Sequence, residues 1–376
     1  MKQVDIIYFD ATSGHRTAAF AIEKALKIQN PTIQVRVLNL VDILESQKVL
    51  QMIARMGVDV FNWGVKREKA WFLRQQVGLF QFIQSHIPQF AINAVAKFWQ
   101  TNPPDAVVSV LPISNWLLER ALHVACPTCP YIIIPVDYAE NKSRYWFDSR
   151  IDAYYINPTP TLHQQCIEVG IEENRAISIK GMPIDPIFYE KPDINKREVL
   201  TQLGLNPDYP TVLVGFGGQG SVMVKRCAKK LAQSHKPVNV IFLCGRHAKL
   251  YREITSTKTH YPKVVLSYLP EPPVYYYHLA DIIIGKPGSM TITESIITAK
   301  AILAIKSKSL ALVQRDNEAW IRQSGVGEVI HVHELPNAIE RVLTSPNIQN
   351  HIQREWHEGV FDISNIIWRM AHGHAL

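Results

Sequence analysis

Residues 281–299, DIIIGKPGSMTITESIITA, have the residue types and spacing best suited to binding a phosphate group. The apolar run 282–284 predicts a strand that enters a tight loop, GKPGS, at residues 285–289. A helix is expected from about Thr291, with Glu294 on its first turn. A helix that begins directly after such a loop presents unpaired backbone N–H groups and a positive dipole end, which favour phosphate. Glu294 could accept hydrogen bonds from ribose hydroxyls, although a solvated glutamate on an ordinary strand–helix turn is the simpler interpretation.

His15 is a second candidate for chemistry, because it follows the first predicted strand. Residues 4–10, VDIIYFD, form that strand, residues 11–14 a loop, and residues 15–28 a helix with several alanines. In an open parallel sheet, ligands bind beyond the carboxyl ends of strands, so His15 is expected at the mouth of a cleft. The positive end of the helix should lower the pKa of His15 and keep the imidazole neutral, as a general base requires. A histidine that packs or caps locally explains the same position.

Asp137 ends another predicted strand. The segment at residues 129–137, CPYIIIPVD, is largely apolar up to its final aspartate. A carboxylate at the carboxyl end of a strand can orient a hydroxyl or a histidine. The alternative is an aspartate that accepts hydrogen bonds from the backbone N–H groups of its own loop.

A second glycine loop lies in the other half of the chain. Residues 211–216, TVLVGF, predict a strand that runs into the loop 217–220, GGQG. The segment also fits the GxGxxG dinucleotide fingerprint, which needs an acidic residue at the end of the next strand. That strand, residues 238–245, is followed by Arg246, so binding of NAD is disfavoured. The backbone N–H groups of the loop can still meet a phosphate.

Gln314 and Asn317 begin a further predicted helix, after the strand at residues 301–305. Their amide groups offer neutral donors and acceptors suited to sugar hydroxyls. Capping of that helix is the alternative interpretation of both residues.

The elements that would position these residues repeat along the chain. The order strand, glycine-containing loop, helix and strand that begins at residue 4 begins again at residue 211. The 376 residues suffice for two α/β domains, each with its own core. We therefore expect two doubly wound, Rossmann-like domains facing a cleft, at residues 1–190 and 191–355. Residues 356–376 are expected to form a C-terminal helix that packs back on the first domain.

Residues 47–100 mix aromatic and basic side chains with apolar residues at helical spacing. Such helices suit the interface of a membrane, although packing against the first sheet explains many of the same residues. The longest uncharged stretch, residues 75–96, contains glutamines, an asparagine, a histidine and a proline, so it is too polar to span a bilayer.

Composition limits the other possibilities. The net charge of +7 is mild, and no dense basic run or aromatic-basic repeat indicates nucleic acid as a partner. Cys126 and Cys129 have redox or zinc spacing, but no second pair completes a metal site. The chain starts directly with a predicted strand and no signal peptide, so we expect a cytoplasmic protein with at most peripheral membrane contact.

Four stretches together resemble glycosyltransferase family 28. Residues 9–22, FDATSGHRTAAFAI, are similar to the family's histidine-bearing loop near the N-terminus. Residues 136–157 and 179–188 resemble its aspartate segment and inter-domain stretch. Residues 214–220 and 281–296 are similar to its second-domain loop and donor-nucleotide motif. The pattern resembles that of monogalactosyldiacylglycerol synthases and bacterial diacylglycerol glucosyltransferases, and more distantly that of the peptidoglycan N-acetylglucosaminyltransferase.

This resemblance implies the two-domain GT-B fold and inverting transfer of a hexose from a UDP-sugar to a lipid hydroxyl, with diacylglycerol as the expected acceptor. By position in the motifs, His15 would be the base and Asp137 would assist it. The residues that would bind the donor are Gly217, Gly218, Gln219, Gly220, Lys286, Pro287, Gly288, Ser289, Thr291, Glu294, Gln314 and Asn317.

The same reading gives the aromatic-basic region a role at an anionic membrane surface, where it would admit the lipid acceptor. Its expected contact residues are Trp63, Lys66, Arg67, Trp71, Phe72 and Arg74. No Asp-x-Asp pair occurs in the chain, so we expect no metal and no cofactor apart from the UDP-sugar donor itself.

Two other functions fit the same architecture. A UDP-sugar 2-epimerase of GT-B fold should need additional carboxylates in the cleft and no lipid-facing surface. A non-catalytic nucleotide-sugar-binding protein should bind UDP without turning over any sugar.

Overall fold

The computed structural model describes residues 1–9, 13–43, 89–112, 114–139, 146–234, 236–306 and 315–374. These residues form two compact units. The first unit comprises the described residues of 1–186 and 358–376, together with Arg315 and Asp316. The second comprises those of 187–306 and 317–357.

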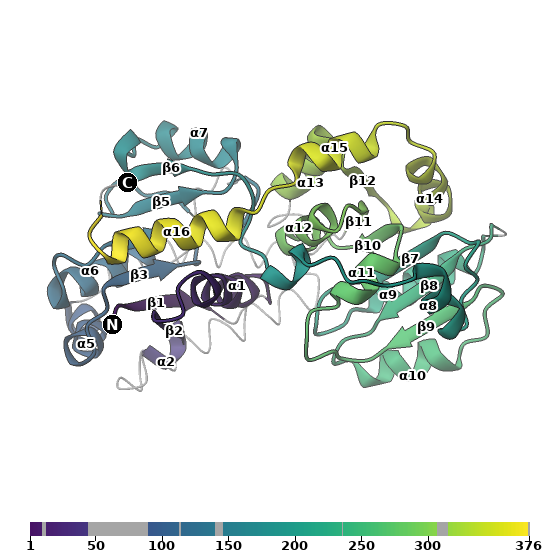
Figure 1. Ribbon diagram of the computed structural model, residues 1–376, viewed down its shortest axis with the longest axis horizontal. Helices are drawn as coiled ribbons and strands as arrows, with labels where there is room; N and C mark the ends of the chain where they lie inside the picture. Colours follow the sequence, from purple (N-terminus) through teal and green to yellow (C-terminus); the bar gives the residue numbers. More distant parts are fainter. Residues whose placement is uncertain are drawn as a thin grey trace. The chain divides into compact units, whose positions relative to one another are not determined.

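The first unit is built on a parallel six-stranded sheet in the order β2-β1-β3-β4-β5-β6 (Figure 1). Its strands are β1 (Gln3–Tyr8), β2 (Gln34–Asn39), β3 (Ala106–Ser109), β4 (Tyr131–Ile133), β5 (Tyr154–Asn157) and β6 (Ala176–Ser178). Strands of a parallel sheet are buried on both faces and therefore read as continuous apolar runs. Accordingly Ile6, Ile7, Val107 and Val108 are completely buried.

Helices flank this sheet. They are α1 (Ser13–Gln29), α2 (Leu40–Ile43), α5 (Gln89–Thr101), α6 (Asn115–Ala125), α7 (Pro160–Glu168), the short η1 (Glu173–Arg175) and α16 (Gly359–Ala371). The C-terminal helix α16 packs beside α1 and touches β3 (Figure 1). Its first residue, Gly359, lies so close to Gly181 that a Cβ there would be 2.0 Å from the Gly181 carbonyl oxygen.

The second unit has a parallel sheet in the order β12-β11-β10-β7-β8-β9. Its strands are β7 (Thr211–Gly215), β8 (Asn239–Leu243), β9 (Lys263–Leu266), β10 (Ile282–Gly285), β11 (Ala301–Ile305) and β12 (Gly327–Ile330). From β7 the chain first builds outward through β8 and β9, then returns to build β10, β11 and β12 on the other side. The order therefore reverses between β7 and β10, which is the switch point where doubly wound sheets bind ligands.

The helices of this unit are α8 (Lys196–Gln202), α9 (Val222–Leu231), α10 (Ala248–Ser256), α11 (Val274–Leu279), α12 (Ser289–Ile297), α13 (Arg315–Ser324), α14 (Leu335–Leu343) and α15 (Ile348–Glu355). The first two residues of α13 are grouped with the first unit. Two short helices, η2 (Pro186–Tyr189) and η3 (Val332–Glu334), complete the second unit, η2 beginning at the last residue of the first unit. Local sequence explains where several of these begin. For example, the Ser221 hydroxyl accepts a hydrogen bond from the Met223 N–H and caps α9.

The two doubly wound α/β units predicted from the sequence are confirmed. Some strands end earlier than the apolar runs suggest. Strand β4 stops at Ile133, so Asp137 lies in the following loop and not at the end of the strand. Pro135 explains this, because proline cannot donate a hydrogen bond to a neighbouring strand.

Residues 44–88 lie outside the described residues, and with them Trp63, Lys66, Arg67, Trp71, Phe72 and Arg74. The part of the aromatic-basic region that is described is α5, whose Ile92, Val95 and Trp99 are buried. Among the described helices, none is both long enough and apolar enough to cross a membrane.

Candidate functional site

The loop at residues 286–288 connects β10 to α12 at the switch point of the second sheet. Gly285, at the end of β10, packs directly on β7, since a Cβ there would lie 2.8 Å from the Gly215 carbonyl oxygen. Helix α12 begins at Ser289, with Gly288 in an extended conformation before it and no side chain capping it in the part of the chain that the structure describes. Its first backbone N–H groups are therefore suited to binding an anion.

Helix α12 begins two residues earlier than predicted, so Glu294 lies on its second turn and not on its first. The Glu294 carboxylate accepts a hydrogen bond from the Tyr277 hydroxyl of α11. Tyr277 is buried, and this burial raises its pKa well above the ordinary value, with the neighbouring Glu294 charge adding to the effect. The phenol therefore keeps its proton and acts as a hydrogen-bond donor to Glu294.

Lys286 supplies a positive charge at the same loop. Its burial lowers the pKa of the ammonium group, and the Glu294 carboxylate opposes that shift. A partly buried ammonium attracts an anion more strongly than a fully solvated lysine would, because less water screens it.

The glycine loop 217–220 follows β7, on the other side of the same switch point. Gly220 has a φ of +75°, and a Cβ there would lie 2.2 Å from the Cys244 carbonyl oxygen. The Gly218 carbonyl accepts a hydrogen bond from the Arg246 N–H at 2.9 Å. This loop therefore needs glycine for its backbone conformation and its packing, and Gly217, Gly218 and Gln219 remain exposed.

Asn317 is buried on α13, and its side-chain amide donates to the Pro287 carbonyl at 3.2 Å. The structure thus gives Asn317 a role in holding the 286–288 loop, which the sequence did not predict. Its predicted contact with a sugar stays a prediction. Gln314 lies outside the described residues.

His15, the third residue of α1, lies at the switch point of the first sheet, where the order reverses between β1 and β3. It forms a hydrogen bond with the Val110 backbone, which follows β3. Its Nδ1 atom is buried and has no hydrogen-bond partner among the described residues. Burial lowers the pKa of His15 to about 4, and the Val110 hydrogen bond offsets only part of this. The predicted lowering is thus confirmed, but burial, not the helix dipole, is its main cause.

Trp146 links His15 to Asp137. Its indole ring stacks on the His15 imidazole with centroids 6.0 Å apart and an interplanar angle of 29°. Its Nε1–H points to Asp137 Oδ2 at 3.4 Å. The structure therefore brings the two predicted catalytic residues to the same buried tryptophan.

Sequence reasoning missed Trp146 and Tyr277. Trp146 follows Asp137 closely in a cluster of aromatic residues, and Tyr277 belongs to a run of three tyrosines. Aromatic clusters usually signal core packing, so the pattern alone does not say which ring donates to a carboxylate.

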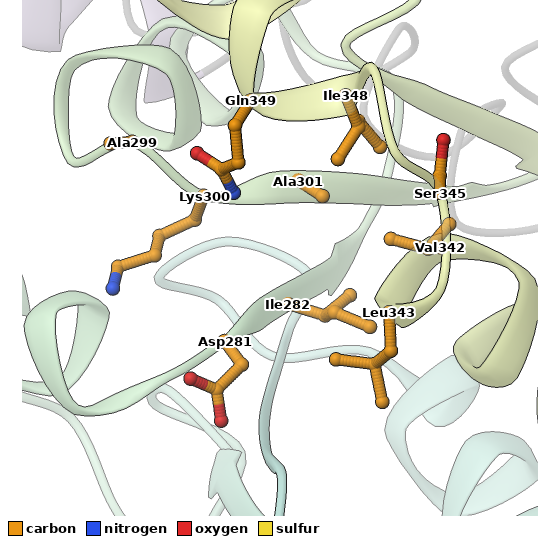
Figure 2. Close-up of a pocket in the computed structure, with 10 residues that line it drawn as sticks. All are labelled: Asp281, Ile282, Ala299, Lys300, Ala301, Val342, Leu343, Ser345, Ile348 and Gln349. Carbon is orange, nitrogen blue, oxygen red and sulfur yellow. The ribbon is translucent and has the colours of Figure 1, made fainter.

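A cavity of about 260 Å³ lies elsewhere in the second unit (Figure 2). Ile282 begins β10 there, directly after Asp281, Ala301 begins β11, and residues of α14 and α15 line the other side of the cavity. These are the amino ends of the strands, whereas the 286–288 loop is at their carboxyl ends. We therefore do not assign the donor to this cavity.

Among the described residues, no group of His, Cys, Asp and Glu side chains is arranged to hold a metal ion. Cys126 and Cys129 are free thiols. Burial raises the pKa of Cys129 to about 12 and that of Cys126 above its ordinary value, which disfavours the thiolate needed for metal or redox chemistry.

The fold is that of the GT-B glycosyltransferases. MurG of Acinetobacter baumannii has a TM-score of 0.61, with 14% sequence identity over 98% of this chain and 100% of that one. The spinosyn rhamnosyltransferase SpnG has a TM-score of 0.59 at 10% identity, covering 99% of this chain and 98% of its own. A complex of S. aureus MnaA with UDP has a TM-score of 0.61 at 12% sequence identity, covering 99% of this chain and 97% of that one.

Two family models divide the chain between them. Residues 15–184 match the monogalactosyldiacylglycerol (MGDG) synthase family, and residues 211–356 match the C-terminal domain of glycosyltransferase family 28. Both matches agree with the resemblance to glycosyltransferase family 28 that the motifs of the chain indicate.

The curated relatives are also glycosyltransferases that are named for lipid acceptors or products. A processive diacylglycerol beta-glucosyltransferase of Bacillus licheniformis is 25% identical over 284 residues, which are 74% of this chain and 66% of the relative. A probable chloroplastic MGDG synthase 2 of Oryza sativa subsp. japonica is 25% identical over 324 residues, 80% of this chain and 65% of the relative. The chain thus spans slightly less than two thirds of the length of these relatives.

Proposed function

We propose that this protein is an inverting glycosyltransferase that moves a hexose from a UDP-sugar to the hydroxyl of a lipid, with diacylglycerol as the acceptor. The observation that carries the proposal is the location of the candidate residues. His15 in the first unit and the loops 217–220 and 286–288 in the second lie where the strand order of their sheet reverses, and the histidine is neutral. The names of the curated relatives support the lipid acceptor.

In the proposed reaction, His15 takes the proton from the acceptor hydroxyl. Its lowered pKa of about 4 keeps it unprotonated at neutral pH, so it can accept that proton. Trp146 holds the face of the imidazole and donates to Asp137, so both side chains have fixed orientations. The acceptor oxygen then bonds to the anomeric carbon on the face opposite the diphosphate, as the bond from that carbon to the diphosphate oxygen breaks.

The departing UDP gains negative charge as this bond breaks. The N-terminus of α12 and the Lys286 ammonium would stabilise that charge, without a metal ion. Glu294 would accept hydrogen bonds from the ribose, and the loop 217–220 would contact the diphosphate through its backbone.

We further propose that the protein acts at the cytoplasmic membrane face, held there by anionic lipids. The charge of the chain supports this. Residues 211–270 contain ten lysines and arginines but only one acidic residue, Glu253. The net charge of this segment alone therefore exceeds the net charge of +7 of the whole chain. Exposed cations of α9 and α10, such as Lys229 and Lys249, belong to this segment. An anionic membrane attracts such a surface.

A transfer assay tests the proposal. Purified protein is mixed with vesicles containing diacylglycerol and with radiolabelled UDP-glucose, UDP-galactose or UDP-N-acetylglucosamine, and label is measured in the extracted lipid. We expect one UDP-sugar to label the lipid, and His15→Ala to reduce the rate at least about a hundredfold, since general base catalysis contributes that much. UDP binding without any labelled lipid, or full activity in His15→Ala, would contradict the proposal.

A further inference from the structure

Tyr277 makes a contact that the proposed reaction does not yet use. It lies on α11, between β9 and β10, and its side chain is buried at 4% exposure. Its hydroxyl donates a hydrogen bond to Oε2 of Glu294. Burial raises the pKa of Tyr277 well above its ordinary value, so the phenol keeps its proton at neutral pH and donates to that oxygen.

A second aromatic ring fixes Tyr277 in place. Phe188 of η2, itself only 3% exposed, packs edge-on against the Tyr277 ring with centroids 5.5 Å apart and an interplanar angle of 89°. Edge-to-face pairs of this kind prefer one relative orientation. The Tyr277 hydroxyl therefore points to Glu294 from a ring with little freedom to turn.

Glu294 needs a fixed hydrogen-bond donor because Lys286 lies near it as well. The Glu294 carboxylate and the Lys286 ammonium attract each other, as the effect of Glu294 on the pKa of Lys286 shows. A carboxylate on a helix can rotate about its side-chain bonds toward a nearby ammonium. A charge-assisted hydrogen bond from a fixed phenol opposes that rotation.

We propose that Tyr277 is a positioning residue that holds the Glu294 carboxylate in the orientation needed to recognise the ribose hydroxyls of the nucleotide donor. This inference rests on the proposed function, because it assumes that Glu294 meets the ribose of UDP. In this proposal Tyr277 acts on the donor only through Glu294.

The simplest competing account is that Tyr277 is an ordinary core tyrosine whose hydroxyl needs a partner. The two accounts differ in what the ribose contributes. If Tyr277 acts through Glu294, removing its hydroxyl weakens only ligands that have ribose hydroxyls. If Tyr277 only stabilises the core, any loss of affinity is the same with or without those hydroxyls.

The experiment measures the affinity of UDP and of 2′,3′-dideoxy-UDP by isothermal titration calorimetry, for the full chain and for Tyr277→Phe. A hydrogen bond to a charged group is the interaction removed, so we expect Tyr277→Phe to bind UDP about tenfold more weakly. Its affinity for 2′,3′-dideoxy-UDP should equal that of the wild type. An unchanged affinity for UDP, or an equal loss for both ligands, would overturn the inference.

Tyr261→Phe is a matched control. Tyr261 is also buried in the second unit, and its hydroxyl donates to the Ala228 carbonyl at 3.2 Å, away from Glu294. We expect it to change neither affinity. Phe188→Leu serves as a second variant, because it loosens the Tyr277 ring without removing the hydroxyl. It should weaken UDP binding by a smaller factor and again leave 2′,3′-dideoxy-UDP unaffected.

The same binding measurements distinguish a failure of the proposed function from a failure of the role given to Tyr277. If the wild type binds neither UDP nor 2′,3′-dideoxy-UDP, the donor site itself is wrong. If the wild type binds UDP and Tyr277→Phe binds it equally well, only the role of Tyr277 is wrong. Glu294→Ala adds a further check, because it removes the partner of the Tyr277 hydroxyl, so Tyr277→Phe should have no further effect on UDP affinity in that variant.

Discussion

At the scale of single residues, the chemistry depends on how burial tunes His15. A solvated histidine is half-protonated near its ordinary pKa of 6.5, whereas His15 has a pKa of about 4. The Trp146 ring on one side and the Val110 backbone nearby leave Nδ1 buried. A general base must be unprotonated to act, and burial keeps the His15 imidazole in that form at neutral pH.

This shift has a consequence for stability. Because the pKa of His15 is lower in the folded protein than in the unfolded chain, the unfolded chain takes up the proton first as the pH falls. The contribution of His15 to the free energy of unfolding is therefore complete above pH 6.5 and declines as the pH falls toward 4. We expect His15→Gln to reduce the loss of stability between pH 6.5 and pH 4, as measured by urea unfolding. His123→Gln, at an exposed position of α6, is the control. An identical pH profile in His15→Gln and wild type would contradict the shift.

Lys286 leads to a prediction for the alkaline side of the pH range. Its lowered pKa means that the ammonium loses its proton at a lower pH than an ordinary lysine does. We expect the affinity for UDP to fall as the pH rises into the alkaline range, before solvated lysines titrate. Lys286→Gln should weaken UDP binding about tenfold at neutral pH, because a charge-assisted hydrogen bond is lost. It should also remove the alkaline decline, and calorimetry over a pH series measures both effects. A decline that persists in Lys286→Gln would assign it to another group.

At the scale of elements, the loops at the carboxyl ends of β7 and β10 determine where a donor can bind. The loop after β7 is held by its contact with the loop after β8, where Gly220 leaves no room for a Cβ beside the Cys244 carbonyl. We therefore expect Gly220→Ala to disturb both loops.

Gly204 provides a matched control for this expectation. Gly204 and Gly220 have almost the same φ, +72° and +75°, but a Cβ at Gly204 would meet nothing within 4 Å. Gly204→Ala should cost only the strain of the left-handed backbone, about 1 kcal/mol of unfolding free energy. Gly220→Ala should cost at least about 2 kcal/mol more, because overpacking adds to that strain. Thermal and urea unfolding measure both, and equal losses in the two variants would contradict the packing seen at Gly220.

The order of elements also explains what the sequence could and could not predict. Apolar strands next to glycine loops and helices predict doubly wound units, because these patterns are local. The switch points that make His15 and Lys286 candidates depend on strand order, which local patterns do not give. Contacts between distant residues, such as Tyr277 with Glu294 or Trp146 with His15, arise only when the strands are assembled. Single side chains in clusters of aromatic residues carry no local signal for such roles.

At the scale of the whole molecule, the distribution of charge is the main feature. The chain outside residues 211–270 has 30 lysines and arginines and 32 acidic residues, so it is nearly neutral. The basic segment includes α9 and α10, which pack on each other, and its one acidic residue, Glu253, pairs with Lys225 at 2.9 Å. A surface of one sign favours binding to a surface of the opposite sign.

We expect the protein to bind vesicles containing phosphatidylglycerol more tightly than vesicles of phosphatidylcholine alone, and less tightly at high salt. Reversing two exposed cations, with Lys229→Glu and Lys249→Glu together, should lower the partition coefficient about tenfold or more. The control reverses two exposed cations of the first unit, Lys97→Glu and Lys180→Glu. Co-sedimentation measures the wild type and the two double variants. An equal loss in both double variants would show that net charge matters and the location of the basic segment does not.

The most direct test of the account is the configuration of the new glycosidic bond. A single displacement at the anomeric carbon, with His15 activating the lipid hydroxyl, inverts the configuration of an α-linked UDP-sugar. The glycolipid formed from diacylglycerol is purified and its anomeric proton coupling is measured by NMR. The account predicts a β-linked hexosyl diacylglycerol; an α-linked product, or no glycolipid from any UDP-sugar, would contradict it.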